Sequence, residues 1–351
     1  MTNKADRPPR PNNGEPEVRN GLFLTIRSPH YWGLGGLLLL LALPLAVRAQ
    51  TSMIDREAVY TAALPLYQYD ASRPLSVKPG STKAIGTTKL LRFSYLSTNN
   101  QRVPALLFLP PGASKAKPVP CLVLLHGLGG GKEQMAGLAL WATQNGYAAL
   151  AIDEYGQGER TVTTAKDADP VKEQARQTAQ LIKTVRQSAV DVRRGLDYLN
   201  TRPDISKTKR GLVGISLGAI IGTVTAGAEP RLKATALVSG GGDWGVILRS
   251  LAVRGGDVGG QNTKNFKAAD WARLTALLAL EDPLTFAPHI APRPLLLIGG
   301  RKDTTIVPQA TQELYDAARQ PKQILWFAPY GHVPPPEVVY PALKTFFAKG
   351  L

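Results

Sequence analysis

The segment Gly214 to Gly218 reads Gly-Ile-Ser-Leu-Gly and places a serine between two glycines. It follows the apolar pair Leu212 and Val213 and opens a run of small residues. A tight turn from a strand into a helix needs glycines on both sides of the serine, and it exposes the hydroxyl at the carboxyl edge of a sheet. Ser216 is therefore a candidate nucleophile.

A serine hydroxyl is a weak nucleophile, so it needs a base that takes its proton and a carboxylate that orients the base. The chain has four histidines. His126 opens a glycine-rich turn and His289 precedes an expected strand, which favours structural roles for both, and His30 lies near the N-terminus. His332 follows the last expected strand and is the candidate base.

Three aspartates compete for the role of the orienting acid. Asp303 follows the expected strand at 294–298, where its carboxylate can turn toward the histidine. Asp282 precedes a proline and is expected to end an inserted segment, and Asp243 could line a pocket. Asp303 is the predicted acid, which completes the set Ser216, Asp303 and His332.

A second glycine-rich turn, His126 to Gly131, reads His-Gly-Leu-Gly-Gly-Gly and follows another expected strand. The tetrahedral intermediate of acyl transfer needs donors aimed at its oxyanion, which are commonly backbone amides from two turns. The amides of Leu128 and Leu217 are the predicted pair. A phosphate-binding loop is the alternative, but Lys132 is followed by Glu133 where such a loop has Ser or Thr.

The elements that must position these residues alternate between apolar strand-like runs and amphipathic helix-like segments. This alternation predicts an α/β fold with a mostly parallel sheet covered by helices on both faces. Strands are expected at 120–125, 147–152, 211–215, 234–238, 294–298 and 323–327, and helices near 133–144, 171–200, 217–227, 307–319 and 335–349. The runs at 89–97 and 102–109 predict an antiparallel hairpin at a sheet edge.

The rhythm of the chain predicts one catalytic domain at 87–351, preceded by a lead-in at 50–86. Residues 241–290 interrupt the alternation and are expected to form a small inserted cap. Cys121 is the only cysteine and lies in an apolar run, so we expect a buried thiol, no intramolecular disulfide and no thiolate metal cluster.

Residues 1–49 have the pattern of an export signal. Residues 1–31 are polar and basic, Trp32 to Val47 are apolar, and Val47-Arg48-Ala49 resembles a signal-peptidase site. The first part is long for a cleaved leader, so an uncleaved membrane anchor stays open. The expected location is secreted or periplasmic, with Gln50 as the first mature residue.

The formal net charge is +16, from 42 Lys and Arg against 26 Asp and Glu. The basic residues are scattered without a dense run, and no nucleic-acid-binding motif is present, so nucleic acid is not an expected partner. A solvated basic surface is the simpler interpretation. Contact with an anionic cell-wall polymer is the alternative.

Together these motifs resemble the α/β-hydrolase superfamily, in particular its dienelactone-hydrolase-like and acetyl xylan esterase-like branches. The resemblance covers roughly residues 60–350 and rests on the serine turn, on His126-Gly127, on the segment Asp153 to Arg160, on Ala291 to Pro294 and on Tyr330 to His332. It implies the chain order serine, acid, histidine. Dienelactone hydrolases proper carry a cysteine nucleophile, so Ser216 implies ester hydrolysis more than lactone opening.

The resemblance implies a carboxylic-ester hydrolase that acts on short acyl or polysaccharide-linked esters and needs no metal or cofactor. The turn after the fourth strand places Tyr155 near the pocket, and Trp244 and Trp271 are candidates for an apolar or sugar-stacking wall, with Tyr155 and Trp244 as the predicted substrate contacts. Two alternatives remain: an exported serine peptidase resembling prolyl oligopeptidases, and a non-catalytic polyanion-binding protein with the same fold.

Overall fold

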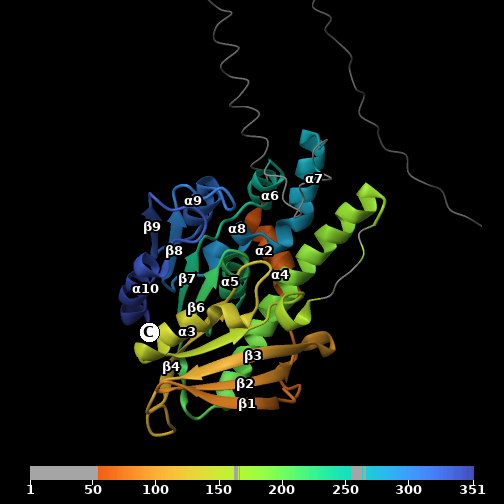
Figure 1. The fold of residues 1–351 in the computed structure, drawn as a ribbon. Helices are drawn as coiled ribbons and strands as arrows, with labels where there is room; N and C mark the ends of the chain where they lie inside the picture. The colour runs from red at the N-terminus through yellow and green to blue at the C-terminus, as the bar shows by residue number, and fades with distance from the viewer. Residues whose placement is uncertain (1–53, 162–164, 166, 254–262, 264–265) are drawn as a thin grey trace, which may run out of the picture. The chain divides into compact units, whose positions relative to one another are not determined.

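A nine-stranded sheet forms the centre of the protein (Figure 1). The computed structural model describes residues 54–161, 165, 167–253, 263 and 266–351. The strand order is β1-β2-β3-β5-β4-β6-β7-β8-β9. At one edge β1 (Lys78–Ile85), β2 (Thr88–Leu96) and β3 (Arg102–Leu109) are antiparallel. The other strands run parallel to one another: β4 (Val119–Leu125), β5 (Ala148–Ile152), β6 (Ile205–Ile215), β7 (Ala234–Val238), β8 (Leu295–Gly300) and β9 (Lys322–Phe327).

Helices cover both faces of the sheet, which confirms the predicted α/β-hydrolase fold. On one face α4 (Pro170–Thr201) and α5 (Leu217–Ala228) pack over the strands, together with α2 (Arg56–Ala63), α8 (Pro283–Phe286) and α9 (Pro308–Ala317). On the other lie α3 (Ala136–Gln144) and α10 (Pro336–Gly350). In β4, Val123 belongs to the first core cluster and its neighbours Leu122 and Leu124 to the second, as expected for a strand buried on both faces.

This topology brings the ends of three strands to one edge of the sheet. Parallel strands carry their carboxyl ends on the same side, so the loops that follow β6, β8 and β9 lie together. Ser216 follows β6, Asp303 follows β8 and His332 follows β9. The fold therefore gathers residues that are 116 positions apart in the chain.

The region between β7 and β8 contains α6 (Trp244–Val253), α7 (Ala268–Leu278) and α8. It coincides with the stretch 241–290 that the sequence predicts as a cap, although the domain boundaries themselves stay a prediction. The predicted leader at 1–49 lies outside the described residues. Within the described part of the chain, no helix combines the length and the apolar composition that a membrane span requires.

The lead-in holds an α-helix, α2, and a strand, β1, that the sequence reasoning missed. Every residue of β1 is exposed, so its sequence Lys-Pro-Gly-Ser-Thr-Lys-Ala-Ile carries no apolar alternation. The strand pairs only with β2 in the sheet order, and its register shifts between Pro79 and Thr82. Prolines and irregularities of this kind are tolerated at a sheet edge.

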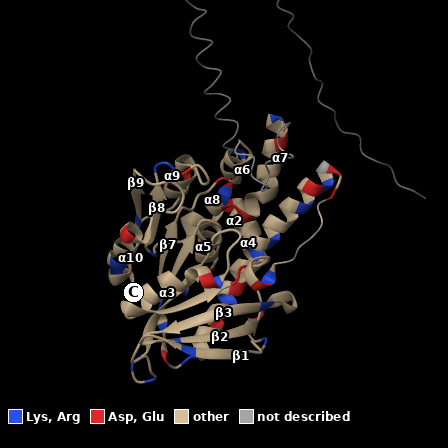
Figure 2. Cartoon of the chain, viewed as in Figure 1, with Lys and Arg blue, Asp and Glu red and all other residues tan. Residues whose placement is uncertain are grey.

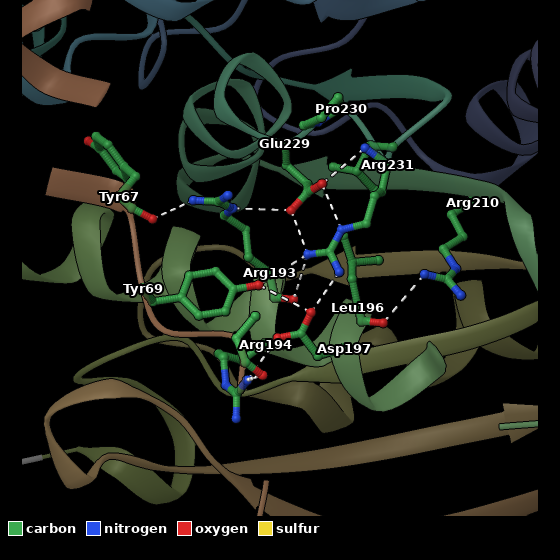
Figure 3. Close-up of polar contacts among 12 residues, drawn as sticks. Tyr67, Tyr69, Arg193, Arg194, Leu196, Asp197, Arg210, Glu229, Pro230 and Arg231 are labelled. Carbon is green, nitrogen blue, oxygen red and sulfur yellow. Dashed lines mark hydrogen bonds and ion pairs between the residues drawn. The ribbon is translucent and has the colours of Figure 1, made fainter. Parts of the chain in front are cut away.

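An arginine cluster fastens the lead-in to the core (Figure 3). Arg193 and Arg231 both point toward Glu229, with nitrogen-to-oxygen distances of 3.1 and 2.7 Å, and Arg231 also pairs with Asp197 at 2.6 Å. Arg193 and Arg194 donate to backbone carbonyls of the lead-in between Tyr67 and Arg73. Basic residues of this cluster are therefore used inside the fold.

Short 3-10 segments connect several elements, at Leu64–Tyr67, Thr98–Asn100, Lys132–Met135, Gly158–Arg160, Ala279–Glu281 and Ala287–His289.

Over the described chain as a whole, Lys and Arg are dispersed on strands, helices and loops with Asp and Glu among them (Figure 2). This dispersion agrees with the simpler interpretation of the net charge.

Candidate active site

Ser216 sits in a strained turn between β6 and α5. Its φ of 55° and ψ of −115° are unusual for a residue with a side chain, and its amide donates to the Val238 carbonyl at 2.9 Å. The flanking glycines are needed because the backbone is crowded. A β-carbon at Gly214 would lie 2.2 Å from the Gly218 carbonyl oxygen, and one at Gly218 would lie 2.5 Å from that of Leu125.

The structure brings together the three residues that the sequence proposes as a triad. His332 Nε2 lies 2.9 Å from the Ser216 hydroxyl oxygen. On the other side of the ring, His332 Nδ1 lies 2.8 Å from Asp303 Oδ2. The Asp303 side chain is 3% exposed, whereas that of His332 is 27% exposed. Hydrogen bonds therefore connect a buried carboxylate to a partly open hydroxyl through one imidazole ring.

Backbone amides and a second serine hold this arrangement. Asp303 Oδ1 accepts from the amides of Thr305 at 2.7 Å and Ile306 at 3.0 Å, which leaves Oδ2 directed at the histidine. The amide of Val333, next to His332, donates to the hydroxyl of Ser239 at 3.0 Å. Sequence reasoning missed Ser239, which simply ends an apolar strand and belongs to no recognisable motif.

The competing aspartates serve as helix caps. Asp282 is fully buried and accepts from the amides of Leu284 and Trp244 at 2.8 and 3.1 Å, so it begins α8 and fixes the start of α6. Asp243 Oδ1 accepts from the amides of Gly245 and Val246. These capping hydrogen bonds give both carboxylates a structural role that is separate from His332.

His126 is buried beneath the glycine-rich turn as a neutral ring. Its Nδ1 lies 2.8 Å from the Gly127 carbonyl, and its Nε2 accepts from the amide of Glu154 at 3.3 Å. The Nδ1–H tautomer satisfies both contacts. Burial lowers the pKa of His126. His126 is therefore a structural residue, as its position in the sequence suggested. His289 stacks on the ring of Tyr60 with centroids 3.4 Å apart, which agrees with a structural role.

The turn that follows His126 lies against the serine. A β-carbon at Gly127 would be 3.5 Å from Cβ of Ser216, so Gly127 is in contact with the serine. Leu128 is the next residue along the chain. Leu217 is the first residue of α5 and directly follows Ser216. Both residues predicted to supply oxyanion donors therefore lie beside the nucleophile, and their role stays a prediction.

The two predicted substrate contacts, Tyr155 and Trp244, differ in their exposure and surroundings. Tyr155 is partly exposed; its amide donates to Ser188 Oγ at 2.8 Å, and Lys183 Nζ lies 4.8 Å from its ring centroid. Trp244 is 3% exposed and packs in the core, and its indole N–H donates to the Glu281 carbonyl at 3.2 Å. The placement of Trp244 is that of a packing residue and gives no support to a substrate-facing wall. Trp271 is partly exposed and packs against Phe266.

Neither a metal-ligand cluster nor a reactive thiol is found at this site among the described residues. Within the described residues, no group of three or more His, Cys, Asp and Glu side chains is placed to hold a metal ion. Cys121 is buried in β4, and burial raises the pKa of its thiol to about 12. The expectation of an inert, buried thiol is therefore met.

Comparison with known proteins gives a family match. The model of the dienelactone hydrolase family matches residues 103–333, which include Ser216, Asp303 and His332. The uncharacterized protein YcjY of Escherichia coli (strain K12) is 30% identical over 151 residues. That match spans 42% of this chain and 44% of the relative, less than half the length of either.

Solved structures share the fold. An acetyl xylan esterase from Paenibacillus sp. R4 is 19% identical with a TM-score of 0.66, over 85% of this chain and 95% of that one. Acetyl xylan esterase 1 from Thermoanaerobacterium sp. JW/SL YS485 is 16% identical with a TM-score of 0.65, over 84% and 93%. A cold-adapted esterase from an Arctic intertidal metagenomic library is 20% identical with a TM-score of 0.54, over 78% and 98%. At these identities the likeness concerns the fold.

Proposed function

This chain belongs to the dienelactone hydrolase family, and from that premise we propose that it is a serine carboxylic-ester hydrolase that works through an acyl-enzyme. One observation carries the proposal: His332 joins the Ser216 hydroxyl, 2.9 Å away, to the buried Asp303 carboxylate, 2.8 Å away. These distances are within the range for a nucleophile, its general base and the group that orients the base.

In the first half of the reaction, Ser216 Oγ attacks the ester carbonyl carbon while His332 Nε2 takes the hydroxyl proton. The tetrahedral intermediate collapses when the carbon–oxygen bond to the alcohol breaks and His332 returns the proton to that oxygen. Asp303 keeps the Nδ1–H tautomer in place and stabilises the imidazolium. In the second half, water attacks the acyl carbon while His332 Nε2 accepts a proton from it. The bond between that carbon and Ser216 Oγ then breaks, His332 returns the proton to Oγ, and the carboxylic acid leaves.

The negative charge of the intermediate needs donors that are already in position. The amides of Leu128 and Leu217 are the proposed pair. Leu217 is the first residue of α5, a helix of 12 residues, so the positive end of the helix dipole also faces the developing oxyanion. Both the proposed backbone donors and the helix dipole therefore favour negative charge beside Ser216.

For the substrate, we propose esters of short acyl groups, either free or attached to a polysaccharide. Two of the solved proteins with the same fold are named acetyl xylan esterases, and the overlap covers more than nine-tenths of each. The nucleophile is a serine rather than the cysteine of dienelactone hydrolases proper, which favours esters over lactones. We further propose that the protein is exported to the periplasm or the medium, as the segment 1–49 suggests.

The test is hydrolysis of p-nitrophenyl acetate by the wild type and by Ser216→Ala. We expect the substitution to abolish turnover down to the background rate while thermal unfolding stays cooperative. Ser114→Ala, in an exposed turn, is the matched control and should keep full activity. An unchanged rate in Ser216→Ala would overturn the proposal, and faster cleavage of peptides than of esters by the wild type would favour the peptidase alternative.

A further inference from the structure

A buried lysine lies at the end of the turn that carries Leu128. Lys132 is 0% exposed, although lysine is rarely buried unless it is paired. Its ammonium nitrogen lies 2.8 Å from Asp153 Oδ2, 2.6 Å from Glu159 Oε1 and 3.2 Å from Glu133 Oε1. Burial alone would lower the pKa of Lys132, but the hydrogen bonds that its ammonium donates to Asp153 and Glu159 more than offset this and raise the pKa. The lysine is therefore a charged group held among carboxylates.

Asp153 is equally buried and binds the turn from the segment that follows β5. Its Oδ1 accepts from the Lys132 amide at 2.8 Å, and its Oδ2 accepts from the ammonium and from the Glu159 amide at 3.0 Å. One carboxylate thus holds both the backbone and the side chain of Lys132. The side chain of Asp153 is 0% exposed, so water does not compete for these bonds.

Two more contacts join the same two segments closer to the nucleophile. The Gly129 amide donates to Gln157 Oε1 at 2.8 Å, and the Gly158 amide donates to the Gly130 carbonyl at 2.9 Å. The space is tight, since a β-carbon at Gly158 would lie 2.4 Å from Asp153 Oδ1. The glycine-rich turn is therefore fastened on its outer side to the segment 153–159, and its inner side lies against Ser216.

Arg92 of β2 closes the network at the surface. It pairs with Glu133 at 2.7 Å and with Glu159 at 2.8 Å, and these three side chains are about half exposed. Exposed pairs of this kind stabilise a protein little, because water and salt screen their charges. The buried pair of Lys132 and Asp153 is consequently the part of the network that can fix the turn.

We propose that Lys132 and Asp153 are positioning residues that fix the Gly127–Gly131 turn, so that the Leu128 amide points at the oxyanion. This inference rests on the proposed function. A buried ion pair stabilises a fold no more than well-packed apolar residues of the same volume. The two hydrogen bonds that Lys132 donates to the Asp153 carboxylate, one from its amide and one from its ammonium, instead fix the direction of the backbone that follows Leu128. A small displacement of an aligned donor can reduce the rate by about 10²-fold.

The test compares p-nitrophenyl acetate with its thiono analogue, in which sulfur replaces the carbonyl oxygen. Sulfur accepts hydrogen bonds weakly, so an enzyme with aligned donors prefers the oxygen ester, and one with misaligned donors loses this preference. In Lys132→Met we expect kcat/KM for the oxygen ester to fall by about 10–100-fold. The ratio between the two esters should fall at least about tenfold, because the thiono rate depends less on these donors.

The matched control removes a charge from the arginine cluster of Figure 3. Arg231→Met also breaks a buried network, yet Glu229 caps the far end of α5, about 18 Å from Ser216 for a helix of 12 residues. It should lower stability and leave the ester ratio of the folded enzyme unchanged. If Lys132→Met does not fold, the double variant Lys132→Met/Asp153→Asn removes both charges of the pair, so neither charge is left buried without the other, and it should show the same loss of ratio.

The outcomes separate the two proposals. A wild type without ester hydrolysis would overturn the proposed function and this inference with it. An active wild type, with a folded Lys132 variant that keeps the ester ratio, would overturn this inference alone. A ratio that also falls in Arg231→Met would show that general destabilisation causes the effect, and it would overturn the inference as well.

Discussion

Single residues in this site depend on partners that do no chemistry themselves. Asp303 is oriented by two backbone amides, and the loop of His332 is held by the Ser239 hydroxyl. In the proposed mechanism each reacting group therefore has its direction set before a substrate arrives, which is the condition for efficient general base catalysis.

Replacing the carboxylate of Asp303 tests this directly. We expect Asp303→Asn to lower kcat by up to about 10⁴-fold, because the amide no longer enforces the Nδ1–H tautomer of His332. The measurement is kcat for p-nitrophenyl acetate on protein that unfolds cooperatively. Asp316→Asn, on an exposed position of α9, is the control. A loss of less than tenfold in the Asp303 variant would remove it from the triad.

Glu154 gives a pH-dependent prediction. Its carboxyl group is fully buried, neither oxygen has a hydrogen-bond partner within the described structure, and His126 Nδ1 is 4.0 Å away. Burial, aided by the charge of Asp153, raises the pKa of Glu154 well above 4.5. The folded state therefore keeps a proton that the unfolded chain releases. Stability from this group is fully present below pH 4.5 and is lost as the pH rises, by about 1.4 kcal/mol per pH unit until the folded pKa is reached.

Glu154→Gln removes this titration. We expect the free energy of unfolding of the variant, relative to wild type, to increase between pH 5 and pH 8 by more than about 1 kcal/mol in urea denaturation. Glu337→Gln, at the exposed start of α10, should follow the wild type at each pH. Parallel profiles for wild type and Glu154→Gln would contradict the raised pKa.

At the level of helices and strands, the position of Ser216, the proposed nucleophile, depends on close packing between β4, β6 and α5. A β-carbon at Gly218 would lie 2.5 and 2.6 Å from the carbonyl oxygens of Leu125 and His126, which are backbone atoms at the end of β4 and the start of the glycine-rich turn. Any side chain at this position must therefore move the strand, the helix or the turn.

We expect Gly218→Ala to lower the free energy of unfolding by roughly 1–3 kcal/mol or more and to reduce activity, because the overpacked contact displaces the Ser216 turn. Thermal unfolding and esterase assays measure both effects. Gly137→Ala is the control: this exposed position of α3 has room for a β-carbon, 3.5 Å from the Tyr340 hydroxyl, and alanine should stabilise the helix by up to about 1 kcal/mol. Equal stability of both variants would contradict the packing argument.

The elements that the sequence predicts well are those whose burial leaves a pattern. The strands β4, β5 and β7 are nearly continuous apolar runs because both of their faces are covered, and α4 carries an apolar stripe. The edge strand β1 is exposed throughout and leaves no such pattern. Ser216 was predictable because its turn demands glycines nearby, whereas Ser239 and Lys132 act through contacts between segments that are distant in the chain.

At the scale of the whole molecule, the net charge of +16 does not define a binding face by itself. Part of it is used internally: Arg193, Arg194 and Arg231 fasten the lead-in to α4 and to the turn after α5. The class of the fold and the chain order of the three proposed triad residues could be predicted from the sequence, whereas the ester substrate depends on pocket side chains that no short motif specifies.

Export is a prediction for the whole molecule. If residues 1–49 are a cleaved signal, the mature protein recovered from a secreting bacterium should begin at Gln50. Intact-protein mass analysis and N-terminal peptide mapping decide this. A protein that keeps Met1 and fractionates with membranes would favour the anchor, and one that keeps Met1 in the soluble cell fraction would contradict export.

If Ser216 is the nucleophile, it must carry the acyl group during turnover, so trapping the acyl-enzyme is the decisive experiment. The protein is mixed with excess p-nitrophenyl acetate, quenched in acid within the first turnover and mapped by peptide mass spectrometry. We predict one added acetyl group, located on Ser216, in the wild type and none in Ser216→Ala. An acetyl group on another residue, or turnover by the wild type without any covalent acetyl group, would contradict the account.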